Sequence, residues 1–416
     1  MKIAVLGSGG REHAIAWKLS QENSVKEVFQ IPGQQGFVNS IPLDIYDFSA
    51  VKEFCLNNFI DLVIVGPENL LAKGIVESFE GTGIFVFGPG KEASKLESSK
   101  IWAKNFMKKY GVETADFLSF KHFLEAENFI LERDGNVVIK YDGLAEGKGV
   151  SVCSCLEEAI LSVKHLHEIH GQEASFLVEE KLVGEELSLL AFTDGKECKF
   201  LIPSQDYKRA FDQNRGPNTG GMGAYCPLPF WNEQIEEEIR EKIVDPTLRG
   251  LYEESLYYCG VIYFGIILTK QGPKLLEYNV RFGDPETEVV LAALKSDLLP
   301  LIMACFQGKL KEVEMSFYPG TFIDVVLASK GYPKAYKTGY EITGLEKLSE
   351  DTLVFYGGVE KGKKTLRTKG GRVLHIVVQG ENLEDASEKV YQECRKIHFN
   401  GMFYRKDISK RLLVTC

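Results

Sequence analysis

Short apolar runs alternate with amphipathic stretches along the first hundred residues of the chain. The apolar runs lie at 2–6, 27–31, 62–65 and 84–87, and the stretches between them have the three-to-four-residue spacing of helices. Strands that alternate with helices are typical of a parallel sheet with helices on both faces. The pattern therefore predicts a doubly wound α/β domain over residues 1–100.

A second, smaller unit is predicted at residues 101–188, and a helix at Lys100–Tyr110 leads into it. Its pattern combines short strands with one long amphipathic stretch, and a glycine-rich turn lies between the first two strands. We expect this unit to move as a lid, because it is small and contains that turn. The elements predicted for it are strands at 137–141, 149–153 and 176–179 and a helix at 156–169.

The rest of the chain is predicted to form a central domain at 189–317 and a small mixed α/β domain at 318–416. Two apolar runs, Val261–Leu268 and Lys274–Val280, flank a Gln-Gly-Pro turn, which predicts an antiparallel hairpin. Further strands and one helix near Glu384–Lys396 follow in the last part. The fold class expected for the whole chain is multidomain α/β and α+β.

The composition excludes several classes of protein. Lys and Arg number 49 against 59 Asp and Glu, a net charge of −10, so the basic surface that nucleic acid requires is missing. The apolar stretches are shorter than the ~20 residues that span a bilayer. The nine cysteines are never spaced as CxxC, which argues against a disulfide framework or a zinc site. We therefore expect a cytoplasmic protein with neither a membrane nor a nucleic-acid partner.

One predicted strand carries polar side chains between apolar flanks. Glu277, Asn279 and Arg281 alternate along it, so all three are expected on one face, with neighbours about 7 Å apart. Carboxylate and amide oxygens suit Mg²⁺, which takes one or two protein ligands and fills its other positions with phosphates and water. Arg281 would then offset charge on a transferred phosphoryl group. The alternative interpretation is a polar stripe that faces solvent.

A glycine-rich turn follows the first strand. Gly7–Gly10 and Arg11 precede a helix whose N-terminus attracts anions, so a phosphate is expected to rest there. A dinucleotide-binding turn has a third glycine where Glu12 stands, and an acid where the second strand of this chain offers Gln30. A nicotinamide cofactor is therefore disfavoured. A tight turn without a ligand is the alternative.

A second glycine-rich turn joins two strands of the predicted lid. Gly143, Gly147 and Gly149 allow the backbone to approach a polyphosphate closely, and Lys148 adds a compact positive charge. Lys140, on the strand before the turn, is placed to point inward as well. The spacing differs from that of a Walker loop. A flexible hairpin tip is the alternative interpretation.

Three further segments are weaker candidates. The strand end at 179–186 offers main-chain groups for an adenine edge and a carboxylate for a ribose, although acidic strand ends are commonly solvated surface. The loops at 204–209 and 216–225 mix charges with glycines, and they either fold over a small substrate or are mobile surface loops. Three histidines within 165–170 lack a completing ligand, so we expect them to be solvated.

Seven strings distributed in order along nearly the whole chain resemble one enzyme family. They are GSGGREHA at residue 7, GPEN at 66, KYDGLAEGKGV at 140, SQDYKR at 204, GPNTGGMGAY at 216, EYNVRFGDPE at 277 and GGRVL at 370. The set is similar to the phosphoribosylamine-glycine ligase family of the ATP-grasp superfamily. GPNTGGMGAY and RFGDPE are specific to that family within the superfamily.

The resemblance implies a function and a set of ligands. It implies an ATP-grasp core with residues 101–188 as its lid and 189–317 as its central domain. In the implied reaction, ATP phosphorylates the glycine carboxylate, and the amine of 5-phosphoribosylamine then attacks the glycyl phosphate. The products are glycinamide ribonucleotide, ADP and phosphate, in purine biosynthesis. Mg²⁺ or Mn²⁺ is the implied metal, ATP is a substrate, and a monomer or weak homodimer is expected.

Site residues follow from the same resemblance, motif by motif. The implied metal ligands are Glu277 and Asn279. The residues implied for ATP are Lys100, Lys140, Gly143, Gly147, Lys148, Gly149, Glu179, Lys181, Leu182 and Glu186. Those implied for the other substrates are Gly10, Arg11, Glu12, Pro67, Glu68, Asp206, Thr219, Gly220 and Arg281. The catalytic candidates are Arg281, Asp206 and Lys148.

Two rival functions are weighed against this one. Another ATP-grasp carboxylate-amine ligase of purine synthesis would use formate or bicarbonate in place of glycine, and the loop at 216–225 argues against it. A nucleotide-binding regulator without catalytic activity is expected to lack Glu277, Asn279 or Arg281, yet all three are present.

Overall fold

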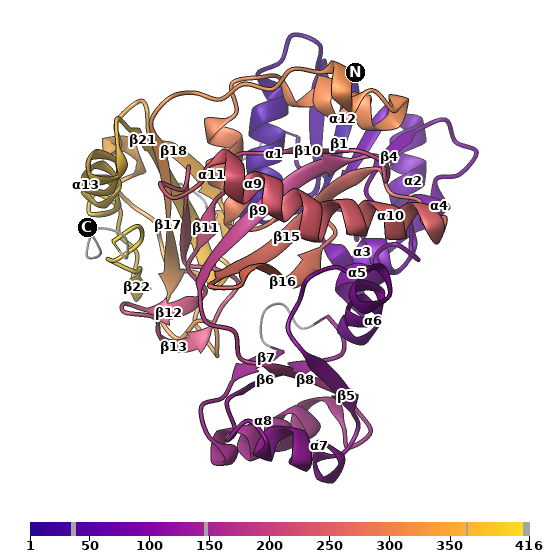
Figure 1. Ribbon diagram of the computed structural model, residues 1–416. Helices are drawn as coiled ribbons and strands as arrows, with labels where there is room; N and C mark the ends of the chain where they lie inside the picture. The colour runs from indigo at the N-terminus through magenta and orange to yellow at the C-terminus, as the bar shows by residue number, and fades with distance from the viewer. Residues whose placement is uncertain (35–38, 145–148, 363–364, 411–416) are drawn as a thin grey trace.

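The computed structural model describes residues 1–34, 39–144, 149–362 and 365–410 (Figure 1). Its N-terminal part is a parallel sheet in the order β2-β1-β3-β4, as the alternating pattern predicts. The strands are mostly buried, which explains their continuous apolar runs. They are β1 (Lys2–Gly7), β2 (Glu27–Pro32), β3 (Leu62–Val65) and β4 (Phe85–Phe87). The helices of this part are α1 (Gly10–Ser20), α2 (Phe48–Asn57), α3 (Glu68–Ala72) and α4 (Ile75–Ser78).

Two helices, α5 (Lys95–Ser98) and α6 (Lys100–Tyr110), connect the parallel sheet to the lid. Helix α6 spans the predicted range because both of its ends have local signals. Ser99 caps its start by accepting the Trp102 N–H at 3.2 Å. Gly111 ends it in the left-handed region, at φ 74°.

The lid is a four-stranded antiparallel sheet in the order β5-β8-β6-β7, with two helices beside it (Figure 1). It has its own hydrophobic core, which includes Ile130, Val163 and Phe176. The sequence pattern does not predict β5 or α7. Strand β5 is short, and no residue in it is fully buried. The lid elements are β5 (Phe117–Phe120), α7 (Phe123–Leu131), β6 (Val137–Tyr141), β7 (Val150–Val152), α8 (Leu156–His170) and β8 (Phe176–Glu180).

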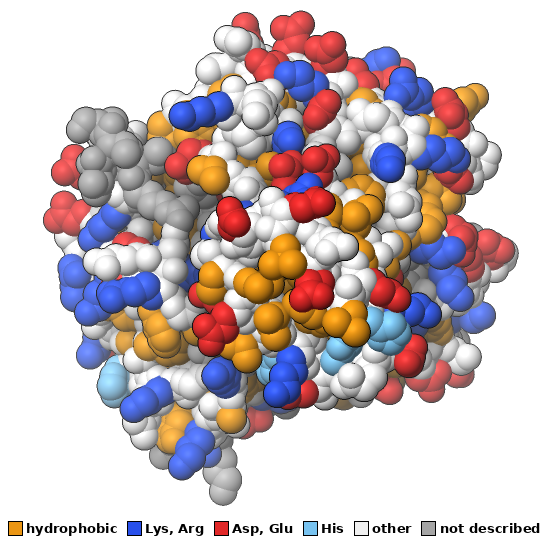
Figure 2. Space-filling model, turned by 60° about the horizontal axis from the view of Figure 1, so that its bottom comes forward, with side chains coloured by type: hydrophobic (Ala, Val, Ile, Leu, Met, Phe, Trp, Pro, Cys, Tyr) orange, Lys and Arg blue, Asp and Glu red, His pale blue; other side chains and the backbone are white. Residues whose placement is uncertain are grey.

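The outer face of the lid exposes apolar side chains. Leu124 on α7 is 80% exposed, and Leu161 and Ile169 on α8 are 57% and 60% exposed. Figure 2 shows this side of the molecule, where hydrophobic side chains gather among basic and acidic ones. The described surface here therefore carries both signs of charge around apolar side chains.

The central sheet is antiparallel, in the order β10-β9-β15-β16. The predicted hairpin is confirmed as β15 and β16, whose register shifts between Gly265 and Ile266. The strands are β9 (Glu185–Thr193), β10 (Cys198–Phe200), β15 (Gly260–Thr269) and β16 (Gly272–Asn279). The helices are α9 (Glu233–Ile239), a π-helical turn at Arg240–Val244, α10 (Asp245–Glu253), α11 (Glu286–Ala293), α12 (Leu298–Gln307) and a 3-10 turn at Leu310–Glu312.

The C-terminal sheet takes strands from two separate parts of the chain. Its order is β11-β14-β17-β21-β18, and β22 also pairs with β17. Strand β14 pairs with β17 from Gly223 opposite Val325 to Cys226 opposite Phe322. The strands are β11 (Gln205–Asp206), β14 (Gly223–Cys226), β17 (Thr321–Ser329), β18 (Leu353–Tyr356), β21 (Arg372–Gly380) and β22 (Met402–Phe403). Helix α13 (Leu383–Cys394), a 3-10 turn at Leu345–Lys347 and the ribbons β12 (Arg209–Phe211) with β13 (Arg215–Asn218) and β19 (Val359–Lys361) with β20 (Leu366–Thr368) complete the description.

Two of the predicted boundaries differ from these sheets. The boundary after residue 188 falls inside β9, so the chain enters the central sheet a few residues earlier. Strands β11 and β14 lie within the range 189–317 but pair in the sheet of the C-terminal part. The sequence has no break at these points, since each strand simply continues an apolar or mixed run.

The N-terminal, central and C-terminal sheets pack into one body, and the lid projects from it (Figure 1). Helix α1 packs against α11 and β18. One hydrophobic cluster contains Ile3 of β1, Tyr263 of β15 and Val377 of β21. Burial of this kind stabilises the body by roughly 25 cal/mol per Å² of apolar surface. Among the described helices, none combines the length and the apolar composition needed to cross a bilayer.

Candidate active site

A cavity of about 880 Å³ lies between the lid and the three-sheet body. A volume in this range accommodates a nucleotide-sized ligand. The predicted site residues that line it are Gly10, Arg11, Glu68, Lys100, Lys140, Gly149, Glu179, Lys181, Leu182, Glu186, Asp206, Thr219, Gly220, Glu277, Asn279 and Arg281. The predicted residues Glu12, Pro67 and Gly143 do not line it. Gly147 and Lys148, including the catalytic role predicted for Lys148, lie outside the described residues.

Strand β16 presents Glu277 and Asn279 to this cavity, as its alternation predicts. Tyr278, between them, is 2% exposed, and its hydroxyl lies 2.7 Å from Thr247 Oγ1 in the core. The polar-stripe alternative therefore does not hold, because the two side chains line the cavity and not the outer surface.

Glu277 lies in a strongly positive environment. Burial raises the pKa of its carboxyl, but the charges of Lys208, Lys140, Lys100 and Arg281 outweigh it and hold the pKa below its ordinary value. No described residue donates a hydrogen bond to this carboxylate. An ionised oxygen ligand without a protein partner, next to an amide oxygen, matches what Mg²⁺ requires of a protein.

Arg281 follows the end of β16, and its guanidinium is held by three side-chain oxygen atoms and by the Phe282 carbonyl at 3.2 Å. Its Nη2 lies 2.8 Å from Glu97 Oε1 and 3.1 Å from Asn279 Oδ1, and its Nε lies 3.2 Å from Glu68 Oε2. Glu97 also accepts the Val280 N–H at 2.8 Å. The positive charge of Arg281 is therefore shared with the carboxylates of Glu68 and Glu97. A contact of this side chain with a phosphoryl group stays a prediction.

Glu179, which the sequence assigns to adenine, directs its carboxylate into a buried ion-pair group. Its Oε2 lies 2.9 Å from Lys140 Nζ and 3.1 Å from Lys104 Nζ. Lys140 also donates to the Leu276 carbonyl at 3.0 Å. Burial lowers the pKa of Lys104 to about 8. Since two ammonium groups share one carboxylate, a net positive charge remains beside β16.

Two other predicted lysines contact the lid. Lys100 Nζ donates to the Gly143 carbonyl at 2.8 Å, which ties the start of α6 to the glycine-rich turn. Lys181 Nζ donates to Ser154 Oγ at 2.8 Å, and its residue lines the cavity just after β8. Lys100, at the start of α6, and Lys181, after β8 of the lid, therefore both line the cavity.

The first glycine-rich turn holds a carboxylate of the protein itself. Glu12 Oε2 accepts the Gly9 N–H at 2.6 Å, and Glu12 Oε1 accepts Arg11 Nε at 2.7 Å. A side chain at Gly7, Gly9 or Gly66 would overlap the Glu12 carboxylate. A phosphate at this helix start stays a prediction, and one of the N–H groups there, that of Gly9, is already bound by Glu12.

Asp206 lies in a second group of polar side chains across the cavity. Its Oδ1 is 2.9 Å from Lys208 Nζ and 3.4 Å from Ser188 Oγ. Ser188 Oγ in turn donates to Glu286 Oε1 at 3.2 Å. Burial, together with the charge of Asp206, raises the pKa of Glu286 to about 7. Sequence reasoning did not single out Glu286, whose only signal was its place directly after the Gly-Asp-Pro turn.

The loop at 216–225 is held in place by the C-terminal part. The Thr219 N–H donates to the Lys208 carbonyl at 2.7 Å. The Gly220 N–H donates to the Tyr332 hydroxyl at 3.0 Å, and the Gly220 carbonyl accepts Arg372 Nη1 at 2.9 Å. This loop is therefore an ordered wall of the cavity and not a mobile surface loop.

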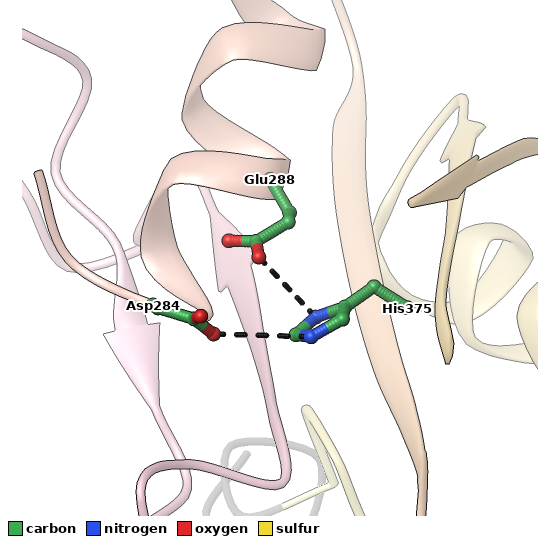
Figure 3. A group of neighbouring side chains, drawn as sticks. All are labelled: Asp284, Glu288 and His375. Carbon is green, nitrogen blue, oxygen red and sulfur yellow. Dashed lines mark ion pairs between the residues drawn. The ribbon is translucent and has the colours of Figure 1, made fainter. Parts of the chain in front are cut away.

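Another group near the cavity was missed entirely. Asp284, Glu288 and His375 converge in Figure 3, and Arg372 Nη1 pairs with Asp284 Oδ1 at 2.8 Å. Asp284 belongs to the string EYNVRFGDPE, and Arg372 belongs to the string GGRVL. Nothing in the sequence connects His375 to them.

The histidines at 165–170 have separate surroundings. His170 stacks on Tyr141 with ring centroids 3.7 Å apart, and His167 meets the edge of Phe176 at 5.8 Å. His165 lies 3.7 Å from Glu168 on the same exposed helix face. The prediction that all three are solvated is wrong for His167, which is 9% exposed.

Comparison with known proteins covers nearly the whole chain. Three family models of phosphoribosylglycinamide synthetase match it: the N domain at residues 1–97, the ATP-grasp (A) domain at 98–287 and the C domain at 322–411. The phosphoribosylamine-glycine ligase of Clostridium acetobutylicum is 44% identical over 99% of this chain and 100% of its own length. That of Halalkalibacterium halodurans is 43% identical over 99% and 97%.

The chain belongs to the phosphoribosylamine-glycine ligase family. A crystal structure of the family from Thermotoga maritima matches with a TM-score of 0.84 and 37% identity over 98% of this chain and 100% of that one. The biotin carboxylase domain of the Hydrogenobacter thermophilus 2-oxoglutarate carboxylase, in complex with MgADP and bicarbonate, matches with a TM-score of 0.71. At 16% identity over 97% of this chain and 91% of that one, the second likeness establishes the fold alone. The ligase family and its ATP-grasp fold confirm the prediction from the motifs.

Proposed function

We propose that this protein joins glycine to 5-phosphoribosylamine with the consumption of ATP, and forms glycinamide ribonucleotide, ADP and phosphate. The observation that supports this most directly is the wall of the cavity at β16. There an ionised carboxylate and an amide, Glu277 and Asn279, face the same space as Lys100, Lys140 and Lys208. Membership of the ligase family supports the choice of substrates.

The lysines are proposed to bind the triphosphate. Lys140 and Lys104 share Glu179, so their surplus charge is available to an anion. Lys100 donates to the Gly143 carbonyl, so it would contact the same phosphates as the glycine-rich turn of the lid. We propose that residues 101–188 close over ATP, because Lys100 and Lys181 already join the lid to the cavity. Leu182 and Glu186 are proposed to hold the adenosine part.

Glu277 and Asn279 fit a divalent cation, because the set contains only hard oxygen donors and Glu277 has no hydrogen bond from a described residue. Mg²⁺ bound there would supply charge compensation for the phosphates. Arg281 keeps the Asn279 oxygen oriented through its 3.1 Å contact. The amide oxygen retains a second lone pair for a ligand.

The chemistry follows from the reluctance of a carboxylate to react with an amine. A glycine carboxylate oxygen attacks the γ-phosphorus of ATP, and ADP leaves. The amine of phosphoribosylamine then attacks the carbonyl carbon, phosphate leaves, and the nitrogen loses a proton. We propose that Asp206 and the loop at Thr219 and Gly220 position glycine, and that this ordered loop excludes water from the acyl phosphate.

The assay is ADP release by the purified protein. Glycine and freshly prepared phosphoribosylamine are added separately and together, and sustained release is expected only with both. Formate or bicarbonate in place of glycine tests the rival ligase. Release that depends on either rival substrate, or the absence of any release, would overturn the proposed function.

Glu277→Gln tests the site itself. Loss of its negative charge removes several kcal/mol of stabilisation at a metal site, so turnover is expected to fall about 100- to 1,000-fold at ~1.4 kcal/mol per decade. Glu238→Gln, at a half-buried glutamate paired with Lys242 away from the cavity, is the matched control. Wild-type turnover of the Glu277→Gln variant at saturating Mg²⁺ would show that the metal lies elsewhere.

A further inference from the structure

Three carboxylates and one imidazole, those of Asp284, Glu288, Asp324 and His375, lie together beside the cavity. This group is separate from Glu277 and Asn279. Asp284 precedes α11, Glu288 lies on α11, Asp324 on β17 and His375 on β21. Glu288, Asp324 and His375 are each 0% exposed. Figure 3 shows the carboxylates of Asp284 and Glu288 directed at the two ring nitrogens of His375: Asp284 Oδ1 lies 3.8 Å from Nε2, and Glu288 Oε1 lies 3.5 Å from Nδ1. Asp284 and His375 also line the cavity.

This group contains polar atoms that lack partners. Both oxygens of Glu288, Asp324 Oδ1 and His375 Nε2 are buried without any hydrogen bond. An unpaired buried polar atom costs about 1–3 kcal/mol, and more if it is charged. Native structures contain few such atoms, and their concentration at one point indicates a missing ligand.

The orientation of His375 favours a cation as that ligand. Its Nδ1 lies 2.7 Å from Asp324 Oδ2, a distance at which the tautomer protonated at Nδ1 donates to this carboxylate. The unpartnered Nε2 then has a free lone pair. Metal-bound histidines almost always donate their other ring nitrogen to a carboxylate or carbonyl in this way, which fixes the tautomer and raises the basicity of the ligand.

The spacing of the oxygen atoms is suitable. Asp284 Oδ1 lies 3.8 Å from His375 Nε2, and one ligand atom from each of Asp284, Glu288 and His375 lies within 4.8 Å of the others. Metal bonds of about 2.0–2.2 Å in a tetrahedral site place ligand atoms roughly 3.5 Å apart, so small side-chain movements are sufficient. Gly10 keeps the space open: a Cβ there would lie 2.5 Å from Glu288 Oε1 and 2.7 Å from His375 Nε2.

The charge balance points the same way. Arg372 compensates Asp284, while Glu288 and Asp324 have no paired Lys or Arg among the described residues. The ionised carboxylates of Glu288 and Asp324 would leave two negative charges without a described Lys or Arg partner. The group must therefore take up either protons or a divalent cation.

We propose that Asp284, Glu288 and His375 bind a transition-metal ion, Zn²⁺ or Mn²⁺, at a site separate from the one at Glu277 and Asn279, with Asp324 orienting the histidine. An imidazole with carboxylates suits these ions better than Mg²⁺. The ion joins α11 to β21, and so fastens the C-terminal sheet to the wall of the cavity. Protonation of Glu288 is the competing account.

The test is titration of the metal-free full-length protein with Zn²⁺ alone, followed by calorimetry and elemental analysis. It is done in a Cys155→Ser background, because Cys155 is the one exposed cysteine among the described residues. One ion per chain is expected. Glu288→Gln and His375→Gln should each weaken binding at least 100-fold, and Asp324→Asn 10- to 100-fold.

Two matched variants define the site. His398→Gln, an exposed histidine, and Glu277→Gln should both retain the tight Zn²⁺. Three outcomes would each overturn the proposal. They are loss of the ion in Glu277→Gln, Zn²⁺ binding by Glu288→Gln and His375→Gln as tight as that of the parent protein, and no tight Zn²⁺ in the parent protein. The last outcome supports a protonated Glu288.

A measurement on the unmutated chain keeps the proposal testable if the variants do not fold. In long-range ¹H–¹⁵N spectra, Zn²⁺ should shift the Nε2 resonance of His375 while Nδ1 stays protonated. No change at either nitrogen when one equivalent of Zn²⁺ is added would contradict the site.

Discussion

Glu97 should make the stability of this protein depend on pH in a specific way. The side chain is buried beside Arg281, and burial raises the pKa of its carboxyl from 4.5 to about 7 although Arg281 acts in the opposite direction. Between these two values the folded state holds a proton that the unfolded state has lost. The free energy of unfolding therefore falls as the pH rises from 4.5 to 7.

The magnitude follows from the two pKa values. A shift of one unit corresponds to about 1.36 kcal/mol, so the full effect is on the order of 3 kcal/mol, and about 2.5 kcal/mol of it develops between pH 5 and pH 8. Glu97→Gln cannot ionise. The unfolding free energy of the wild type minus that of Glu97→Gln should thus decrease by about 2.5 kcal/mol over this interval.

The assay is urea unfolding at pH 5 and pH 8. Fluorescence and circular dichroism transitions must coincide before free energies are compared, because the chain has several sheets with separate cores. Glu238→Gln, on the surface of α9, should differ from wild type by no more than about 0.5 kcal/mol at both pH values. If the difference between wild type and Glu97→Gln is the same at pH 5 and pH 8, Glu97 does not hold the extra proton.

Two further substitutions test the supports of the cavity. Gly66→Ala should destabilise the protein by about 1–3 kcal/mol, because the added Cβ overlaps the Glu12 carboxylate and displaces it from the Gly9 N–H; an unchanged urea midpoint would contradict this packing. Ser99→Ala should cost about 1 kcal/mol through loss of the α6 cap. Ser99 also donates to Asp142 in the lid, so backbone amides near Asp142 should exchange hydrogen faster in the Ser99→Ala variant than in the wild type. Unchanged exchange would argue against that link.

The sequence predicted those elements whose signals are local. Helix α6 has a capping serine and a terminal glycine, and β16 alternates polar and buried positions from Glu277 onward, so both were found at nearly their observed bounds. Strand β5 was not found, because two of its four residues are exposed and a hydrophobic pattern needs a buried face.

From the hydrophobic and polar pattern alone, without the family resemblance, the candidate site was predictable only where its residues lie on one element. Glu277 and Asn279 share a strand, and alternation alone places them together. His375 comes from β21 and meets Asp284 and Glu288 only through tertiary packing, which no spacing rule encodes. The occupation of the first turn by Glu12 had one signal, a glutamate where a dinucleotide-binding turn has glycine, but its direction toward Gly9 required coordinates.

The pairing of β14 with β17 has a consequence for how the chain matures during synthesis. When a ribosome has released residues up to 317, β14 has its partner β11 on one edge and only water on the other. That open edge is a template for association with other nascent chains until β17 emerges and occupies it. Assembly of the cavity wall at residues 205–226 therefore waits for the last quarter of translation, and a shortened product ending at 317 should aggregate.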